Sequence, residues 1–248
     1  MKRVSSMSLS ENHDYTGNTD FRLFSQKKNH KSKSFFCENP NYSVFPEKNE
    51  GAEEISRNTE YTEDDRKNRI VGGTLYLVTT PIGNLADLSD RAKKTLAGVD
   101  FVAAEDTRNS AKLLTLLGIH KPMVSYFEHN KRERGEVICE RLRGGESCAL
   151  VTDAGMPGIS DPGEDIVRLC AERNIPVTAV PGPCAAVTAL TLSGLFTARF
   201  AFEGFLSTNR GERTERLAKL KGDDRTLIFY EAPHKLRGTL DDLLAAFG

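Results

Sequence analysis

The sequence lacks several features that would assign it to a class at once. It contains no tryptophan, and none of its five cysteines forms a C-x-x-C pair or lies near a run of histidines. An odd number of cysteines without such spacing is typical of a reducing compartment and predicts no structural zinc site. We therefore expect a cytoplasmic protein that binds no metal.

Long hydrophobic runs are also missing. The longest, in residues 185–195, is interrupted by threonine and serine, and it falls short of the roughly 18–20 apolar residues that span a bilayer. The basic start Met1-Lys2-Arg3 is followed by polar residues, whereas a secretory signal continues with an apolar core. The sequence predicts neither membrane insertion nor export.

Neither sign of charge is in clear excess. The chain has 34 basic and 35 acidic residues, for a formal net charge of −1. Charge alone therefore predicts no polyanionic partner, and any contact with nucleic acid must come from a local basic patch.

Residues 1–72 form a polar N-terminal extension. They are rich in Ser, Asn, Lys and Glu and show no sustained helical or strand periodicity. Such a composition cannot bury enough apolar surface to fold, so we expect disorder. A basic run in residues 27–33 and an acidic stretch in residues 47–65 would suit an interaction tail. A solvated extension without function is the simpler interpretation.

Strands alternate with helices in residues 73–197. This alternation predicts an α/β domain with a mainly parallel sheet that is covered by helices. Ser89 is a candidate helix N-cap, with Gly98 as the end of that helix. The expected strands are residues 75–80, 101–104, 123–126, 148–152 and 176–180. The expected helices are residues 89–97, 108–117, 132–142, 165–172 and 184–192.

Residues 198–248 read as a second, smaller α/β domain. Strands are expected at 202–206 and 226–230, and helices at 212–220 and 233–244. Two strands and two helices cannot bury both faces of a sheet, and small units are poorly stabilised. We therefore expect this domain, and the chain, to be incomplete at the C-terminus.

Four loops that follow expected strands are rich in Gly and Pro. They are residues 80–85, 153–163, 180–186 and 231–235. Ligands of open parallel sheets lie beyond the carboxyl ends of the strands, where loop backbone N–H groups lack partners. The second loop holds three glycines, two prolines and two acids in eleven positions, which is more than a turn requires. No G-x-G-x-x-G or P-loop motif is present, so binding of a dinucleotide or ATP loses support.

The same segments carry a family resemblance. TPIGNL, AEDTR, TDAGMPGISDPG, VPGPCAA, EGFL and LIFYEAPHK occur in this order between residues 73 and 248. Together they resemble the tetrapyrrole methylase superfamily, and AEDTR and YFEHN are closer to its branch that acts on small-subunit (16S) ribosomal RNA. The resemblance implies an S-adenosylmethionine-dependent methyltransferase that modifies the ribose 2′-oxygen of a cytidine in the 30S subunit. It also implies a homodimer in which the cofactor lies in a cleft between two α/β domains.

Carried over position by position, the resemblance implies a set of cofactor-binding residues in the four loops. Met156 stands where the family usually has a small or hydroxylated residue, and the A-R-E-[LF]-T-K segment of the family is absent. The implied residues are Pro81, Asp153, Ala154, Gly155, Met156, Pro157, Gly158, Pro181, Gly182, Pro183, Ala185, Glu231, Ala232 and Pro233.

Methyl transfer to a hydroxyl is an in-line displacement, so the protein chiefly aligns the reacting atoms. A base that takes the hydroxyl proton would assist, and the candidates are Glu105, Asp106 and His129. Arg108, Lys131 and Arg132 are candidate contacts to RNA phosphates. An equally good interpretation of AEDTR is a helix N-cap at Asp106 with Arg108 in an ion pair.

Two other function classes stay open. One is a tetrapyrrole or diphthine methylase of the same superfamily, which would use the same cofactor cleft. The other is an inactive remnant that has lost part of the second domain and folds poorly or only binds a partner. Affinity for S-adenosylmethionine would separate a remnant from an enzyme.

Overall fold

The computed structural model describes residues 68–248, and the predicted extension at 1–72 lies almost entirely outside this range. The first part of the described chain is a five-stranded sheet. Its strands are β1 (Leu75–Val78), β2 (Phe101–Ala104), β3 (Met123–Ser125), β4 (Cys148–Val151) and β5 (Val177–Val180). They lie in the order β3-β2-β4-β1-β5, and all neighbours are parallel, as the sequence predicts.

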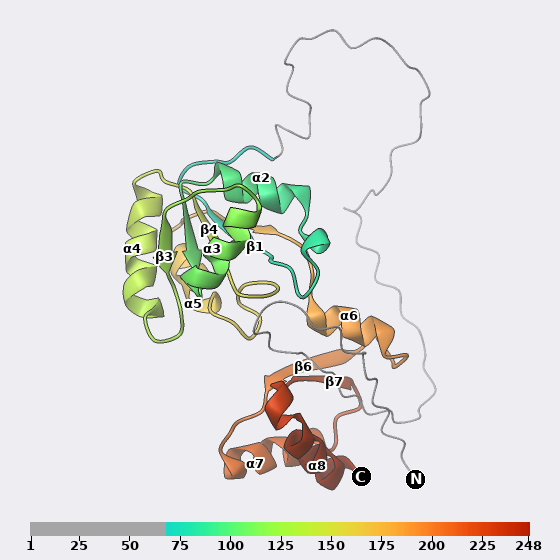
Figure 1. Ribbon diagram of the computed structural model, residues 1–248. Helices are drawn as coiled ribbons and strands as arrows, with labels where there is room; N and C mark the ends of the chain where they lie inside the picture. The colour runs from blue at the N-terminus through green and yellow to red at the C-terminus, as the bar shows by residue number, and fades with distance from the viewer. Residues whose placement is uncertain (1–67) are drawn as a thin grey trace, which may run out of the picture. The chain divides into compact units, whose positions relative to one another are not determined.

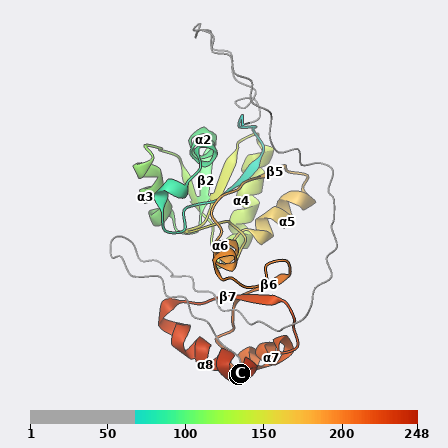
Figure 2. The ribbon, with the colours of Figure 1, turned by 90° about the vertical axis from the view of Figure 1, so that its right-hand side faces the viewer.

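Helices cover both faces of this sheet (Figures 1 and 2). They are the α-helices α2 (Asp90–Gly98), α3 (Thr107–Leu116), α4 (Lys131–Arg143) and α5 (Glu164–Glu172). The short 3-10 helix η1 (Leu85–Asp87) precedes α2 and buries no residue, and α6 (Ala185–Leu192) packs with Ala186 and Leu190 against Ile228 and Tyr230 of the second sheet. Because alternate side chains of a strand point to opposite faces, Leu75 packs in one core with α4 and α5. Its neighbour Tyr76 packs in the other with α2 and α3. The sheet is therefore the middle of three layers.

Local capping fixes where these helices begin. The Ser89 hydroxyl accepts a hydrogen bond from the Ala92 backbone N–H, as predicted for the N-cap of α2, and α2 ends at Gly98. Asp106 caps α3 by accepting from the backbone N–H of Arg108. Side chains of this kind satisfy backbone donors that the first turn of a helix leaves unpaired.

A second sheet follows in the chain. It contains the parallel strands β6 (Phe200–Phe205) and β7 (Thr226–Tyr230), and a bulge interrupts their register between Phe202 and Gly204. The helices α7 (Arg210–Leu220) and α8 (Leu236–Phe247) pack against one face of this sheet in a core of their own. A 3-10 turn, η2 (Pro233–Lys235), precedes α8.

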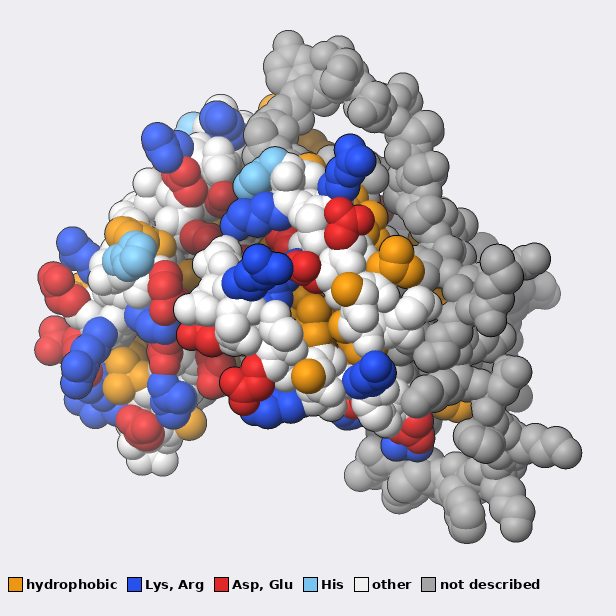
Figure 3. Space-filling model, turned by 90° about the horizontal axis from the view of Figure 1, so that it is seen from below, with side chains coloured by type: hydrophobic (Ala, Val, Ile, Leu, Met, Phe, Trp, Pro, Cys, Tyr) orange, Lys and Arg blue, Asp and Glu red, His pale blue; other side chains and the backbone are white. Residues whose placement is uncertain are grey.

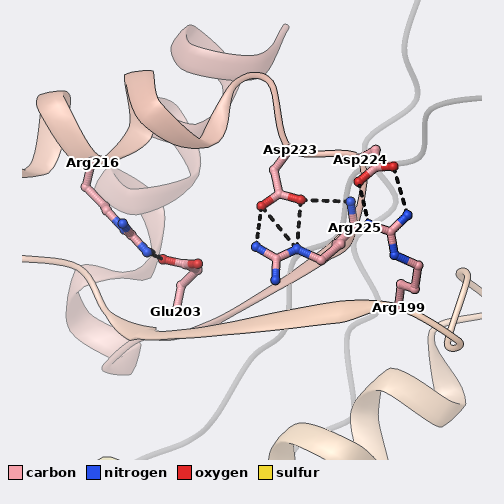
Figure 4. A network of polar contacts seen from close by, with 6 residues as sticks. All are labelled: Arg199, Glu203, Arg216, Asp223, Asp224 and Arg225. Carbon is pink, nitrogen blue, oxygen red and sulfur yellow. Dashed lines mark hydrogen bonds and ion pairs between the residues drawn. The ribbon is translucent and has the colours of Figure 1, made fainter.

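Ion pairs tie this second sheet to its helix and its turn (Figure 4). Glu203 of β6 accepts a hydrogen bond of 2.8 Å from Nε of Arg216 on α7. Asp223 pairs with Arg225, and Asp224 pairs with Arg199, in the segments that lead into β7 and β6. Each of these three carboxylates therefore has a guanidinium partner.

The boundary between extension and domain lies close to residue 70. Ile70 packs against the α2 and α3 core, and the Val71 N–H donates to the Tyr76 hydroxyl at 2.8 Å. The predicted divisions after residues 72 and 197 stay predictions, since Ile70–Gly248 fall in one compact unit. Within residues 68–248, no helix is both long and apolar enough to cross a bilayer.

Candidate functional site

Strands β1 and β4 are neighbours in the sheet, but their chains leave in opposite directions. The loop after β1 leads to α2 on one face, and the loop after β4 leads to α5 on the other. Such a switch point opens a crevice at the carboxyl ends of the two strands, where α/β proteins bind their ligands. The first two of the four predicted loops meet here.

Two adjacent threonines hold these loops together. The backbone N–H of Thr80 donates to Gly155 O at 3.0 Å, and the Gly155 N–H donates back to Thr80 O at 3.2 Å. The Thr80 hydroxyl donates to Thr152 O, and the Thr79 hydroxyl donates to Val180 O, each at 3.0 Å. Since the three loops after β1, β4 and β5 are joined by these bonds, their backbones form a preorganised floor.

A cleft lies above this floor. It spans about 340 Å³ of space, open solvent at its mouth included. Its walls are mostly apolar, with one carboxylate and one phenol. The lining residues are Ile82, Ala154, Gly155, Met156, Ile159, Ser160, Asp161, Cys184, Ala185 and Tyr230.

Glycine is required at two places in the loop after β4. Gly155 has a φ of +88°, a conformation that L side chains rarely adopt. A Cβ on Gly163 would lie 2.7 Å from the Gly158 backbone N, so the two ends of the loop can approach only without a side chain there. Gly155 and its neighbours Ala154 and Ala185 in the cleft wall have little or no side chain, which suits a ligand that packs closely against the backbone.

Met156 enters the cleft from the same loop. The Thr79 hydroxyl lies 3.0 Å from this sulfur and 3.0 Å from Val180 O, so the two acceptors share its single proton and the thioether lies against the end of β1. The sequence singled out this position as a departure from the family pattern. The structure places Met156 among the residues that line the cleft, with its sulfur against the Thr79 hydroxyl.

Acidic groups gather where β2 and β4 end. Burial, followed by the charges of Glu105 and Asp153, raises the pKa of Asp161 to about 7. The pKa of Glu105 is also raised, first by burial and then by the charge of Asp153. Because like charges disfavour joint ionisation, at least one of these carboxyls holds its proton far above the usual range.

Asp106 lies beside this group but behaves differently. Hydrogen bonds from the Arg108 side chain and backbone lower the pKa of Asp106 to about 2. Its Oδ2 pairs with Arg108 Nη2 at 2.8 Å, and its Oδ1 caps α3. The structure therefore confirms the interpretation of AEDTR as a helix N-cap with an ion pair. The Arg108 side chain is nevertheless 86% exposed.

The other candidate base lies away from the cleft. His129 is exposed and meets Phe127 edge to face, with 6.1 Å between ring centroids. Lys131 pairs with Glu128 at 2.7 Å and with Asp165 at 2.6 Å, and Arg132 is exposed on α4. These residues form an outer rim of aromatic and basic groups and do not line the cleft.

The predicted cofactor residues divide into two groups. Four of them line the cleft, namely Ala154, Gly155, Met156 and Ala185. The others lie in the same loops or at the end of β7 without lining it; they are Pro81, Asp153, Pro157, Gly158, Pro181, Gly182, Pro183, Glu231, Ala232 and Pro233.

Among this second group, two side chains are bonded to other parts of the protein. The Asp153 carboxylate accepts from Asn109 Nδ2 at 3.0 Å. The buried Glu231 carboxylate accepts from the Thr239 hydroxyl and from the Ala232 N–H.

Sequence reasoning did not single out Tyr230. Its hydroxyl accepts a hydrogen bond of 3.1 Å from the Ala186 N–H in the first turn of α6, and its ring packs edge to face on Phe202 and Phe205. The last residue of a buried strand is normally interpreted as part of the hydrophobic core. Only the position of Tyr230 next to the loop at 231–235 could have indicated that it lines the cleft. The other lining residues lie in the loops that the sequence predicts as ligand-binding but were not named individually; they are Ile82, Ile159, Ser160, Asp161 and Cys184.

The distribution of charged side chains on the surface limits how the protein could contact RNA. On the face shown in Figure 3, basic and acidic side chains are interspersed, with hydrophobic groups between them. This pattern agrees with the net charge of −1. Any phosphate contact on that face must come from individual cations and not from a continuous basic field.

Comparisons with known proteins give a consistent picture. Residues 74–248 match the family model of the Tetrapyrrole (Corrin/Porphyrin) Methylases. A protein of Synechocystis named ribosomal RNA small subunit methyltransferase I is 51% identical over 176 residues, covering 71% of this chain and 63% of the relative. Its namesake from Haemophilus influenzae is 49% identical over 176 residues, covering 71% of this chain and 62% of the relative.

Solved structures show the same fold. The uroporphyrin-III-C-methyltransferase of Thermus thermophilus matches with a TM-score of 0.51 and 22% identity, over 71% of this chain and 74% of that one. The present chain spans 62–63% of the length of the two curated relatives described above.

Proposed function

Because this chain belongs to the tetrapyrrole methylase family, we propose that it transfers a methyl group from S-adenosylmethionine to the ribose 2′-oxygen of a cytidine in 16S ribosomal RNA. The observation that carries this proposal is the cleft at the β1/β4 switch point, whose floor is made of the family's own loop segments. The names of relatives at 49–51% identity support RNA as the substrate.

The cleft suits the cofactor in its chemistry. Bound S-adenosylmethionine supplies an electrophilic methyl group. The residues of this chain would hold the nucleoside part against Ala154, Gly155 and Ala185, where small side chains let a flat ring approach the backbone. Met156 and Ile159 exclude water from the same walls. Methyl transfer then requires alignment of a hydroxyl with the bound group, and a rigid floor provides it.

The rim offers contacts for the RNA. We propose that Arg108 and Arg132 contact phosphates, since both are exposed near the carboxyl end of the sheet. Lys131 already forms ion pairs with two carboxylates. It could contact an RNA phosphate only if one of those ion pairs broke. Phe127 and His129 can stack on unpaired bases, as aromatic groups do in single-stranded RNA recognition.

The alternative classes are less well supported. A tetrapyrrole methylase is favoured by fold alone, because the uroporphyrin enzyme shares 22% of its residues with this chain. An inactive remnant is not favoured by the cleft, since the glycines that shape it are in place.

We also propose that the protein acts in the cytoplasm as a homodimer. Four free cysteines among the described residues suit a reducing compartment. Val187, Leu192, Phe196, Phe200 and Phe205 are exposed on or near α6 and β6, and apolar surface of this kind is typical of an interface. Sedimentation equilibrium would measure the mass of the species in solution.

The test of the reaction uses small ribosomal subunits from cells that lack the modification. The chain is incubated with these subunits and S-adenosylmethionine labelled in the methyl group, and the RNA is then hydrolysed in alkali. A 2′-O-methyl group blocks cleavage at the adjacent phosphodiester, so label should appear in an alkali-resistant dinucleotide. Label on a base would contradict the ribose assignment, and transfer to a tetrapyrrole in place of RNA would favour the alternative.

A further inference from the structure

Resting on the proposed function, we propose that Asp161 accepts the proton of the ribose 2′-hydroxyl during methyl transfer. The inference starts from position. Asp161 is the carboxylate among the cleft-lining residues, whereas Glu105, Asp106 and His129, the bases suggested by sequence, are not among them. A proton acceptor must reach the reacting hydroxyl, so the cleft wall is where it has to be.

The surroundings of Asp161 leave its carboxylate available. Within residues 68–248, no lysine or arginine forms an ion pair with Asp161, in contrast to Asp106, which Arg108 neutralises. The charged groups that act on it are Glu105 after β2 and Asp153 after β4. The charge of Asp161 in turn acts on Tyr230 at the end of β7.

Burial and two of these neighbours affect basicity in the same direction. Desolvation on burial, followed by the negative charges of Glu105 and Asp153, raises the pKa of Asp161 to about 7. A carboxylate with an ordinary pKa near 4 is a weaker base than one whose pKa is raised toward neutral pH. A base that is half ionised near pH 7 combines availability with proton affinity.

The step balances without any further reactant. The hydroxyl O–H bond breaks and its proton passes to the Asp161 carboxylate. An electron pair of the hydroxyl oxygen forms the new bond to the methyl carbon. The bond between that carbon and sulfur breaks, and its electron pair stays on sulfur. A cationic sulfonium becomes a neutral thioether while an anionic carboxylate becomes a neutral acid, so total charge is conserved. Asp161 returns its proton to solvent before the next turnover.

The proposal predicts a specific pattern in Asp161→Asn. The amide keeps the size of the side chain but cannot accept the proton, so kcat should fall at least ~100-fold, the lower end of what general bases contribute. The KM for RNA and the Kd for S-adenosylmethionine should stay within about threefold. Wild-type kcat should rise with pH through a midpoint near or below 7, and this rise should vanish in the variant. Glu164→Gln, a matched change outside the cleft, should behave like wild type.

A readout that does not depend on turnover accompanies the kinetics. Carbon-13 NMR of the carboxyl groups in the free protein should show one aspartate that titrates far above the ordinary range, and this signal should be missing in Asp161→Asn. If no aspartate titrates above about pH 5.5, or if Asp161→Asn keeps wild-type kcat and its pH dependence, the inference is overturned alone. Absence of methyl transfer by the wild-type chain overturns the proposed function and the inference with it.

Discussion

Gly155 shows how a single residue determines the shape of the cleft. Its φ of +88° turns the loop after β4 back toward β1, where its N–H and C=O pair with Thr80. A Cβ at this position would make only ordinary contact with Ile82. The obstacle to substitution is therefore the backbone conformation, which costs a β-branched residue on the order of 1–3 kcal/mol.

We expect Gly155→Val to abolish binding of S-adenosylmethionine, because relief of that strain would move the backbone that forms the cleft wall. Gly118→Val is the matched control. It has the same kind of strained φ, +68°, at the end of α3, away from the cleft. Calorimetric titration should show no binding heat for the first variant and wild-type affinity for the second. Normal titration by Gly155→Val would mean that the pocket lies elsewhere.

The raised pKa of Asp161 also predicts that the stability of the protein depends on pH. Its pKa is raised in the folded protein to about 7, so its contribution to folding is fully present below the unfolded pKa near 4 and is lost as pH rises through about 7. Asp161→Asn carries no charge at any pH. Relative to wild type it should therefore gain stability between pH 5 and pH 8, on the order of 1 kcal/mol because the carboxyl is partly solvated. Thermal unfolding of both proteins at the two pH values measures this difference, and a constant difference would contradict it.

At the scale of elements, the buried Glu231 links three parts of the second sheet unit. Its carboxylate follows β7 and accepts from the Thr239 hydroxyl on α8, while Arg213 on α7 donates to the same hydroxyl at 2.7 Å. Arg213 Nη1 lies 3.8 Å from the Glu231 carboxylate. A buried charge of this kind is tolerated only while its partners stay in place.

Thr239→Val should therefore lower the free energy of unfolding by about 1–3 kcal/mol, since it keeps the side-chain volume but removes a buried hydrogen-bonding group. Thr214→Val is the control, because its hydroxyl is exposed and bonds only to the Arg210 carbonyl one turn earlier in α7. That change should cost less than about 0.5 kcal/mol. Equal effects of the two substitutions in urea unfolding would show that the network does not stabilise the fold.

The elements themselves were largely predictable because their signals are local. The strand Phe101–Ala104 and the N-cap at Ser89 follow from apolar runs and capping chemistry, and the structure has both. The prediction for β6 covered residues 202–206, whereas the strand is Phe200–Phe205, with a bulge between Phe202 and Gly204 that no local pattern indicates.

The walls of the cleft were harder to predict for a related reason. Tyr230 meets Ala186 across 44 positions of sequence, and no local pattern reports a contact of that kind. Asp161 lies in a loop that the sequence did single out. The raised pKa of Asp161 depends in part on the charge of Glu105. The two residues come close together only because β2 pairs with β4.

At the scale of the whole molecule, the polar extension and the packed domain meet near residue 70. Ile70 contacts the core so closely that a Cβ on Gly98 would lie 2.6 Å from its Cγ1. Gly73 donates to the carbonyls of Gly145 and Glu146 at 3.2 and 3.0 Å. The composition of residues 1–67 predicts no comparable packing.

We therefore expect removal of residues 1–67 to leave the midpoint of thermal unfolding unchanged, since a segment that buries little apolar surface contributes little to stability. Removal of residues 1–72 should instead cost about 1–2 kcal/mol, because it also deletes the partly buried Ile70 side chain and the Val71 bond to Tyr76. The pair of deletions is its own control, differing by five residues. A loss of more than about 1 kcal/mol in the shorter deletion would show that the extension docks on the domain, and equal stability of both would show that the segment around Ile70 adds nothing.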